Sequence, residues 1–442
     1  MRCPGSCALL LVGTAVLGCG KKAVVSPPAV ELTVWHTFNT EETGTFNRVL
    51  ERVREAHPGV RIWSTIVPFS RAQASFLRAV EGCGPGAPDL FRAELPWLPE
   101  LVERGLVRAA PSSIPGETAY EPVARALARY RGQRWALPAS LDGLALLYNR
   151  RLIAQPPRTL SELVETARKL TTDERGRHPG EEGFTPARVA RWGFYVRAES
   201  YWFLPVLWGL DGDLLDPRRG QIFVDRPEAS GALGFYRDLI HVHHVAPPNP
   251  GLASDYDDQL RRFGQGEVAM IFNGPWSTSA ILATSAFREA QNLGVAPLPV
   301  GRAGKPVALL SGHGFVVSRC ARRPELAWRV AAALTDHAAQ REFARANTLL
   351  PTMSAVYGDP ALGERGLVRK FRAALDGARL RPAHPFWTRI FDDFTPAVEA
   401  VLLGDAEPGE ALAGVARAWR RGLGSRAREA RHGGRAARDG AP

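Results

Sequence analysis

Strand-like and helix-like segments alternate along the chain after residue 30, and this alternation limits the folds that the chain can adopt. Leu32–His36, 60–67 and the stretch "APDLFRAE" are short apolar segments typical of buried strands. Between the first two, apolar residues from Phe46 to Val53 recur every three or four positions, which predicts a helix. Strands separated by helices are typical of a mostly parallel sheet with helices on both faces. We therefore predict an α/β protein, and its 442 residues are enough for two or three domains.

One predicted strand is followed by a large aromatic residue. Val268–Phe272 is an unbroken apolar run within the stretch "GEVAMIFNGPWSTS", and residues 273–275 should end the strand. Trp276 comes directly after this break. In open α/β sheets, ligands bind beyond the carboxyl ends of the strands. Trp276 is therefore our first candidate binding residue, and the alternative is a ring that packs as a lid on the junction of strand and turn.

The N-terminal region carries the pattern of a lipoprotein signal. Arg2 is its single positive charge, and the apolar run "ALLLVGTAVLG" is too short to span a bilayer. The run ends at the small residue Gly18, and Cys19 follows directly. A small residue followed by cysteine at the end of such a run resembles a bacterial lipobox. We predict a signal peptide over 1–18 and a lipidated tether over 19–30, so the protein would be a membrane-anchored lipoprotein in the periplasm or elsewhere outside the cytoplasm. A plain secretory signal is the alternative.

Cysteine usage agrees with a location outside the cytoplasm. Of the five cysteines, Cys3 and Cys7 lie within the predicted signal peptide, and Cys19 is the predicted lipid site. Cys83 and Cys320 are left as an even pair in an oxidising compartment. They form a disulfide only if the fold brings them together, which their positions in the sequence do not show.

The net charge of +11 is concentrated near the C-terminus. Residues 417–442 hold eight Arg against one Glu and one Asp, a net charge of +6. Because the end of this segment is rich in Gly, Ala and Arg and poor in large apolar residues, we predict a disordered basic tail over 424–442. No RNA- or DNA-binding motif accompanies the charge, so we expect no nucleic-acid partner. Attraction to anionic lipid headgroups is the alternative to a merely solvated tail.

Several longer stretches resemble a single family. They are "WALPASLDGLALLYN", "FGQGEVAMIFNGPW", "LGVAPLP", "LLSGHGFVVS" and "PELAWRVAAALT". From Leu32 to about Leu423 the chain is similar to the maltose- and maltodextrin-binding proteins of ABC importers, which belong to extracellular solute-binding protein family 1. The resemblance implies the two-lobe periplasmic-binding-protein fold (type II), in which each lobe is a mostly parallel sheet flanked by helices and the sugar lies between the lobes.

The resemblance also implies that each lobe is built from separate parts of the chain, because the chain of this family crosses between the lobes more than once. We predict an N-terminal lobe formed by residues 31–141 and 300–350. The C-terminal lobe would then consist of residues 142–299 and 351–423.

The resemblance assigns sugar-binding roles to the stretch "RAESYWFLP". Glu199 matches the sugar-binding glutamate of the family, and Tyr201 and Trp202 match its paired aromatic residues. Aromatic rings suit the apolar face of a sugar, and carboxylates suit its hydroxyls. The alternative for the two aromatic residues is packing in the core. Asp142 occupies the position of a family glutamate near a crossing between the lobes, with a structural aspartate as the alternative.

The remaining candidates follow strands of the first lobe or lie near the end of the chain. In "HTFNTEE", polar residues after the first strand suit either sugar binding or helix capping. In "FRAELPWLPE", an acid and a tryptophan replace those of the family at shifted positions. The stretch "SGHGF" holds a histidine, a residue type that is commonly structural. The stretch "RPAHPFWTRIF" holds an aromatic residue at the position where the family has an aromatic ring that stacks on the sugar. These candidates are Asn39, Thr40, Glu94, Trp97, His313 and Trp387.

Together these features predict a lipid-anchored substrate-binding protein of an ABC sugar importer. It would bind a maltodextrin-like or other oligosaccharide as a monomer and deliver it to the permease subunits. One alternative is a receptor of the same fold for a polyamine, iron or glycerol phosphate, and another is a glycosidase that uses Asp142 and Glu199 as its carboxylate pair. We expect no enzymatic activity, no cofactor and no metal, since His241 and His244 in "HVHH" have no third ligand nearby in the sequence.

Overall fold

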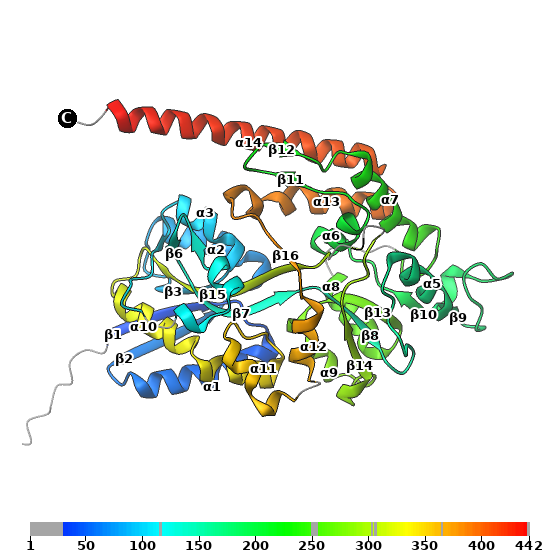
Figure 1. The fold of residues 1–442 in the computed structure, drawn as a ribbon, viewed down its shortest axis with the longest axis horizontal. Coiled ribbons are helices and arrows are strands. Elements are labelled where there is room, and N and C mark those ends of the chain that lie inside the picture. The colour runs from blue at the N-terminus through cyan, green and yellow to red at the C-terminus, as the bar shows by residue number, and fades with distance from the viewer. Residues whose placement is uncertain are drawn as a thin grey trace, which may run out of the picture.

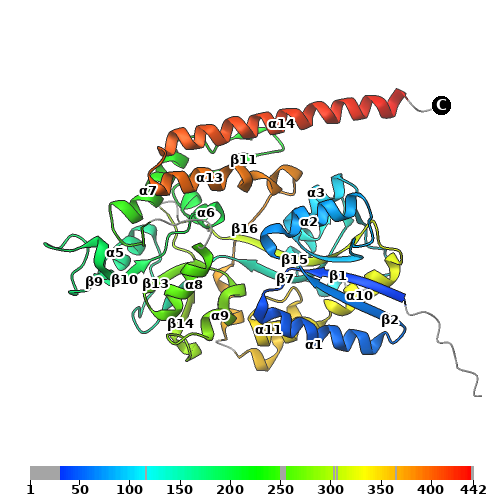
Figure 2. The same cartoon turned by 180° about the vertical axis from the view of Figure 1, so that it is seen from behind.

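Two β-sheets, each flanked by helices, form the body of the protein in this computed structural model (Figure 1). The first sheet and its helices lie on the left of Figure 1, and the second sheet lies on the right. Figure 2 shows the same two lobes from behind, with β7 running toward the second lobe and β15 antiparallel to it. The structure describes residues 30–439 without 115–116, 249–254, 302–303, 305–306 and 364–365.

The first sheet has seven strands and is organised around β15. β1 pairs in parallel with β2 and β3, whereas β15 runs antiparallel to β3, β4 and β7. The short β16 pairs in parallel with the start of β15. The strands are β1 (Val30–His36), β2 (Val60–Ile66), β3 (Leu90–Glu94), β4 (Val107–Arg108), β7 (Leu137–Gly143), β15 (Leu309–Ser318) and β16 (Arg379–Leu380).

The second sheet has five strands in the order β14–β8–β13–β10–β9, and β10 with β13 is its parallel pair. The predicted two-lobe α/β fold is confirmed, but both sheets are mixed rather than mostly parallel. The connection between the two sheets is short. β7 ends at Gly143 and β8 begins at Ala145, so the chain passes from the first sheet to the second without an intervening helix. The strands are β8 (Ala145–Asn149), β9 (Thr172–Asp173), β10 (Val189–Phe194), β13 (Val268–Asn273) and β14 (Leu293–Ala296).

The helices of the first lobe follow the predicted periodicity. Asn39 caps α1 through a reciprocal pair of hydrogen bonds. Its side-chain Oδ1 accepts from the backbone N–H of Glu42 at 2.8 Å, and its backbone N–H donates to Glu42 Oε2 at 3.1 Å. The apolar residues from Phe46 to Val53 turn toward the core. The helices are α1 (Thr40–Ala56), α2 (Phe69–Glu81), α3 (Leu98–Glu103), α4 (Pro122–Leu127), α10 (Pro324–Leu334) and α11 (His337–Asn347), with the ribbon of β5 (Arg129–Tyr130) and β6 (Gln133–Arg134).

The helices of the second lobe include a group formed by α6, α7, α13 and α14 that packs together above the second sheet (Figure 1). They are α5 (Leu160–Leu170), α6 (Ser200–Gly209), α7 (Pro227–His241), α8 (Asp255–Gln265), α9 (Thr278–Leu282), α12 (Leu367–Ala374), α13 (Ile390–Leu403) and α14 (Pro408–Asp439). A small ribbon of β11 (Leu215–Asp216) and β12 (Gln221–Ile222) lies beside them.

The C-terminal helix differs from the prediction. α14 continues to Asp439, so the segment 424–442 that we expected to be disordered is helical over most of its length. Ala and Arg are among the best helix formers, and here they outweigh the glycines on which the prediction rested. The first half of α14 is fixed to the second lobe by Trp419, whose ring lies 6.0 Å from that of Phe394 on α13.

The predicted signal peptide, the lipid site Cys19 and the tether up to residue 29 lie outside the described residues. Among the helices that the structure does describe, none combines the length and the apolar character needed to cross a bilayer.

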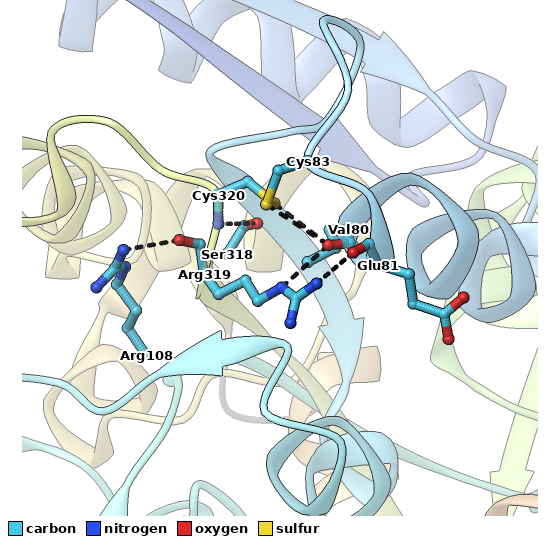
Figure 3. Close-up of a disulfide and its surroundings, with 7 residues drawn as sticks. All are labelled: Val80, Glu81, Cys83, Arg108, Ser318, Arg319 and Cys320. Atoms are coloured by element: carbon cyan, nitrogen blue, oxygen red, sulfur yellow. Dashed lines mark hydrogen bonds between the residues drawn. A yellow bond between two sulfur atoms is a disulfide. The ribbon is translucent and has the colours of Figure 1, made fainter.

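A disulfide joins two segments of the first lobe that are far apart in the sequence. Cys83 follows α2 and Cys320 follows β15, and their Cα atoms lie 5.3 Å apart across a separation of 237 residues. Next to the bond, Arg319 Nε donates to the Val80 carbonyl at 3.1 Å, and the same guanidinium reaches the Glu81 carbonyl (Figure 3). The pairing that the sequence left open is therefore present, and it ties α2 to β15.

Replacing both cysteines by serine should lower the stability of the protein, because the crosslink restricts the unfolded chain. Disulfides typically contribute about 2–4 kcal/mol to the free energy of unfolding. We expect Cys83→Ser combined with Cys320→Ser to lower the midpoint of urea unfolding, followed by tryptophan fluorescence. The reduced wild-type protein is the matched control and should unfold at the same midpoint as the variant. A variant as stable as the oxidised wild type would show that the bond has no structural role.

Candidate functional site

Strand β15 collects the polar candidates of the first lobe. His313 lies opposite Glu94 of β3 on one side and opposite Ser140 of β7 on the other. Ser311, two residues earlier, lies opposite Asp142 of β7. The register of β15 therefore brings together Glu94, Asp142 and His313, which are far apart in the sequence.

Asp142 and His313 form a hydrogen-bonded pair. His313 Nδ1 lies 2.9 Å from Asp142 Oδ2. Burial, assisted by the nearby Arg92 guanidinium, lowers the pKa of His313, so we assign a neutral ring that donates its Nδ1 proton to the carboxylate. Nε2 is then an acceptor, and it is buried without a hydrogen-bond partner among the described residues.

Glu94 is held by an arginine from the last third of the chain. Glu94 Oε1 accepts from Ser311 Oγ at 3.1 Å and lies 2.8 Å from Arg381 Nη2. Arg381 directly follows β16, which pairs with β15 at Leu310. The guanidinium also lies 5.6 Å from the ring centre of Tyr201 on α6, so Arg381 connects the first sheet to the second lobe. We name the acid–arginine cluster by its members: Glu94, Asp142, His313 and Arg381.

Tyr201 lies next to the acid–arginine cluster, at the start of α6. Burial and the carboxylate of Asp142 raise the pKa of Tyr201, with Glu94 and Glu199 acting in the same direction, so its hydroxyl stays protonated. Its ring is partly buried and meets the ring of Trp202 edge on at 5.3 Å. Tyr201 thus presents a hydroxyl among acids that come from both lobes.

Glu199 is an acid that is surrounded by protein and still accessible. Burial raises the pKa of Glu199, although its side chain is 44% exposed. Its Oε2 lies 3.2 Å from Arg197 Nη2, and Arg197 Nε lies 3.1 Å from the fully buried carboxylate of Asp255. Glu199 occupies the N-cap position of α6 but makes no capping hydrogen bond. Its exposed carboxylate is therefore not used for capping and can accept further hydrogen bonds from a ligand.

Trp202, in contrast, lies in the core, which is the alternative to sugar binding that the sequence analysis gave for this residue. The side chain is buried, and its Nε1 donates to the Phe272 carbonyl at 2.7 Å. The guanidinium of Arg197 lies 3.8 Å from the ring centre and covers one face. Trp202 therefore positions Arg197, and through it Glu199, rather than offering that face to a sugar.

Trp276 and Asn39 bring the two lobes into direct contact. Trp276 lies on a short 3-10 helix, η4 (Pro275–Ser277), and is partly buried. Its ring lies over Gly274, where a Cβ would come within 2.0 Å of a ring carbon, so only glycine fits beneath it. Asn39 caps α1, and its Nδ2 also donates to the Trp276 carbonyl at 3.1 Å. One side chain therefore serves both as a helix cap and as a contact between the lobes.

Phe69, an aromatic residue that the sequence analysis missed, faces the same region. It is the first residue of α2, it is 51% exposed, and its ring lies 5.5 Å from Trp97 and 5.8 Å from His313. Trp97 itself is buried, so it supports Phe69 rather than presenting its own face. The signal that identified Trp276 would also have identified Phe69, because each is an aromatic residue that follows a strand and a proline.

Two further candidates show no contact with the acid–arginine cluster in the part of the chain that the structure describes. Thr40 is exposed at the start of α1. Trp387 lies on η8 (Pro385–Thr388) and is buried, so its ring offers no accessible face, and its Nε1 has no hydrogen-bond partner among the described residues.

Arg92, a buried arginine that the sequence analysis also missed, supports the first-lobe side of the site. Its Nη1 donates to Thr37 Oγ1 at 2.7 Å, and its guanidinium lies 4.1 Å from the ring centre of Phe38. Burial lowers the pKa of Arg92 to about 10, against the opposing effects of Glu42 and Asp142. Arg92 is still charged at neutral pH, and it supplies positive potential behind Asp142.

The histidines of "HVHH" contact the backbone. His241 Nε2 lies 2.8 Å from the Leu402 carbonyl, and His244 Nδ1 lies 3.2 Å from the Ile240 carbonyl. Within the residues that the structure describes, no group of three or more His, Cys, Asp or Glu side chains is arranged to hold a metal ion.

Comparison with known proteins identifies the family. The sequence profile of the bacterial extracellular solute-binding proteins matches residues 39–341, which is more than half of the chain. The chain therefore belongs to this family of extracellular solute-binding proteins.

Individual relatives agree with this assignment. The maltotriose-binding protein of Pyrococcus abyssi is 24% identical over 379 residues, which cover 84% of this chain and 77% of that protein. A probable ABC transporter-binding protein of Deinococcus radiodurans is 27% identical over 338 residues, which cover 73% and 77%. The GacH receptor of Streptomyces glaucescens, solved without ligand and with acarbose, is 29% identical with a TM-score of 0.80, and the match covers 89% of this chain and 98% of that chain.

Glu42 should make the stability of the protein depend on pH. Burial raises the pKa of Glu42 to about 6 from its usual 4.5, so ionising it in the folded protein is unfavourable. The raised pKa lowers the free energy of unfolding as the pH rises. This loss is absent at low pH, grows from pH 4.5 through 6, and reaches about 2 kcal/mol. Glu42→Gln cannot ionise and keeps an acceptor for the Asn39 amide. We expect the variant to melt above the wild type at pH 7.5.

The control for this prediction is the same pair of proteins at pH 4.5. There the wild-type carboxyl group is largely protonated, so the advantage of the variant should disappear in thermal unfolding followed by circular dichroism. A difference in melting temperature that stays constant from pH 4.5 to 7.5 would contradict a raised pKa at Glu42.

Proposed function

We propose that this protein is the substrate-binding protein of an ABC importer for an oligosaccharide. The sugar would bind between the acid–arginine cluster of the first lobe and α6 with Trp276 in the second lobe. The observation that carries this proposal is that carboxylates and partly exposed aromatic rings from both lobes converge on one region between the lobes. Relatives described as a maltotriose-binding protein and as a receptor solved with acarbose support a glucose-based ligand.

The side chains of this region suit a neutral sugar. In our proposal Glu199 and Asp142 accept hydrogen bonds from hydroxyl groups, while Trp276 and Phe69 cover the apolar faces of sugar rings. The acids already have partners within the protein, since Arg381 lies against Glu94 and Arg197 lies against Glu199. A cationic ligand such as a polyamine would have to compete with these arginines, whereas a neutral sugar would not. This favours the sugar over the polyamine alternative.

A sugar in this position would be linked to the approach of the lobes. The hydrogen bond from Asn39 to Trp276 and the contact of Arg381 with Tyr201 both join the first lobe to the second. A ligand that touches both lobes stabilises the arrangement in which they are close together. We propose that the permease recognises this arrangement and receives the sugar from it.

We further propose that the protein is held at the outer side of a membrane by a lipid on Cys19, because Cys19 follows a lipobox-like sequence. Cys19→Ala should move the protein from the membrane pellet to the soluble fraction of the expressing cells, as detected by immunoblotting. A variant that stays in the pellet would overturn the lipid anchor without affecting the proposed ligand.

Trp276→Ala should weaken sugar binding without unfolding the protein. Loss of a stacking surface should cost about 1.4 kcal/mol or more, which corresponds to at least a tenfold loss of affinity. The measurement is calorimetric titration with maltotriose and a panel of other glucosides. Spermidine and glycerol 3-phosphate in the same series represent the alternative ligands.

Trp63→Ala is the matched control, because Trp63 is an exposed tryptophan on the outer strand β2 of the first sheet. This variant should bind the sugar like the wild type, and both variants should melt near the wild-type temperature. Equal affinities for Trp276→Ala and the wild type, or binding of spermidine instead of any glucoside, would count against the proposal. Recovery of the sugar intact after prolonged incubation separates the receptor from a glycosidase.

A further inference from the structure

A cavity lies between elements of both lobes, and none of its lining residues belongs to the acid–arginine cluster. It has a volume of about 910 Å³ and is lined by residues of α11 on one side and by residues of β8, β14, α9 and α12 on the other. α11 packs against α1 of the first lobe, whereas β8 and β14 belong to the second sheet. A cavity of this volume is large enough for a small organic molecule.

The side chains that line this cavity are strongly basic. Among the residues that the structure describes, four cationic residues contribute to its walls and no acidic residue does. Arg345 comes from α11, Arg150 follows β8, and α12 supplies the other two cations. The four residues are Arg150, Arg345, Arg369 and Lys370.

These cations lack the acidic partners that arginines have elsewhere in the described structure. Among the described residues, Arg150 and Arg369 donate to backbone carbonyls, those of Gln291 at 3.4 Å and Tyr357 at 2.6 Å. None of the four forms an ion pair within the residues that the structure describes. On the same helix α12, Arg372 does pair with an acid, Glu121, at 3.1 Å.

Burial and a neighbouring positive charge both act on Lys370. Burial lowers the pKa of Lys370, and the positive charge of Arg150 lowers it further. Like charges on one surface repel each other, and a bound anion reduces that repulsion.

Tyr148 and Gly294 both line the cavity, and they pack closely together. The ring of Tyr148 lies over Gly294 of the neighbouring strand β14, where a Cβ would come within 2.2 Å of the ring. Only glycine at this position allows the ring to lie across the sheet.

We propose that this cavity binds a small organic anion that carries at least two phosphate or carboxylate groups. Arg345 and Lys370, from the two sides of the cavity, contact the separate anionic groups, and Arg150 contributes to the field between them. The anion thereby bridges α11 of the first lobe and α12. This site is independent of the proposed sugar site, and its test does not require a sugar.

The test is calorimetric titration of the full chain with citrate and with inorganic tripolyphosphate, in a buffer of constant ionic strength. Tripolyphosphate and citrate distinguish phosphate from carboxylate recognition. We expect saturable binding of at least one of them by the wild type. The double variant Arg345→Gln and Lys370→Gln should bind at least tenfold more weakly, because each charge-assisted hydrogen bond contributes strongly to affinity.

The matched control is the double variant Arg218→Gln and Arg329→Gln, which removes the same charge from exposed positions outside the cavity. It should bind the anion like the wild type. All three proteins should melt at similar temperatures without the anion, which shows that the substitutions leave the fold intact. Equal weakening in both double variants, or no saturable binding of either anion by the wild type, would overturn the proposal.

Discussion

The pairing of β15 with its neighbours is the constraint on which the candidate site depends. β3, β7 and β16 all pair with this strand, and they deliver Glu94, Asp142 and Arg381 to one place. Every residue of β15 is buried except His313, which is partly exposed beside Asp142. A shift of one residue would turn His313 to the opposite face of the sheet and expose apolar side chains. The burial of β15 therefore protects the geometry of the site.

The same register concentrates charged groups where water is scarce, and this has a cost in stability. Unpaired buried charges are strongly unfavourable, and the site avoids them by pairing Glu94 with Arg381 and Asp142 with His313. The pairing is incomplete, because His313 Nε2 and Arg381 Nε are buried without partners among the described residues. Each buried polar atom without a partner carries a desolvation cost in the folded protein.

The sequence predicts those parts of the fold and of the site that depend on local patterns. The cap of α1 at Asn39 and the place of Trp276 after a buried strand follow from a few consecutive residues. Arg381 follows a strand of two residues that no pattern identifies, and its partner Glu94 is nearly three hundred residues away. The core position of Trp202 depends on Arg197 covering its ring, a contact that periodicity does not show. Helix, strand and turn signals are local, whereas the sites are assembled by long-range pairing.

Hydrogen exchange followed by mass spectrometry, with and without a saturating malto-oligosaccharide, tests the central claim most directly. If the sugar is held by both lobes, amide exchange should slow in residues 92–97 and 311–314 of the first lobe. It should also slow in residues 197–202 and 274–278 of the second lobe. Protection restricted to one lobe, or protection only at a distance from these four segments, would contradict a binding site between the lobes.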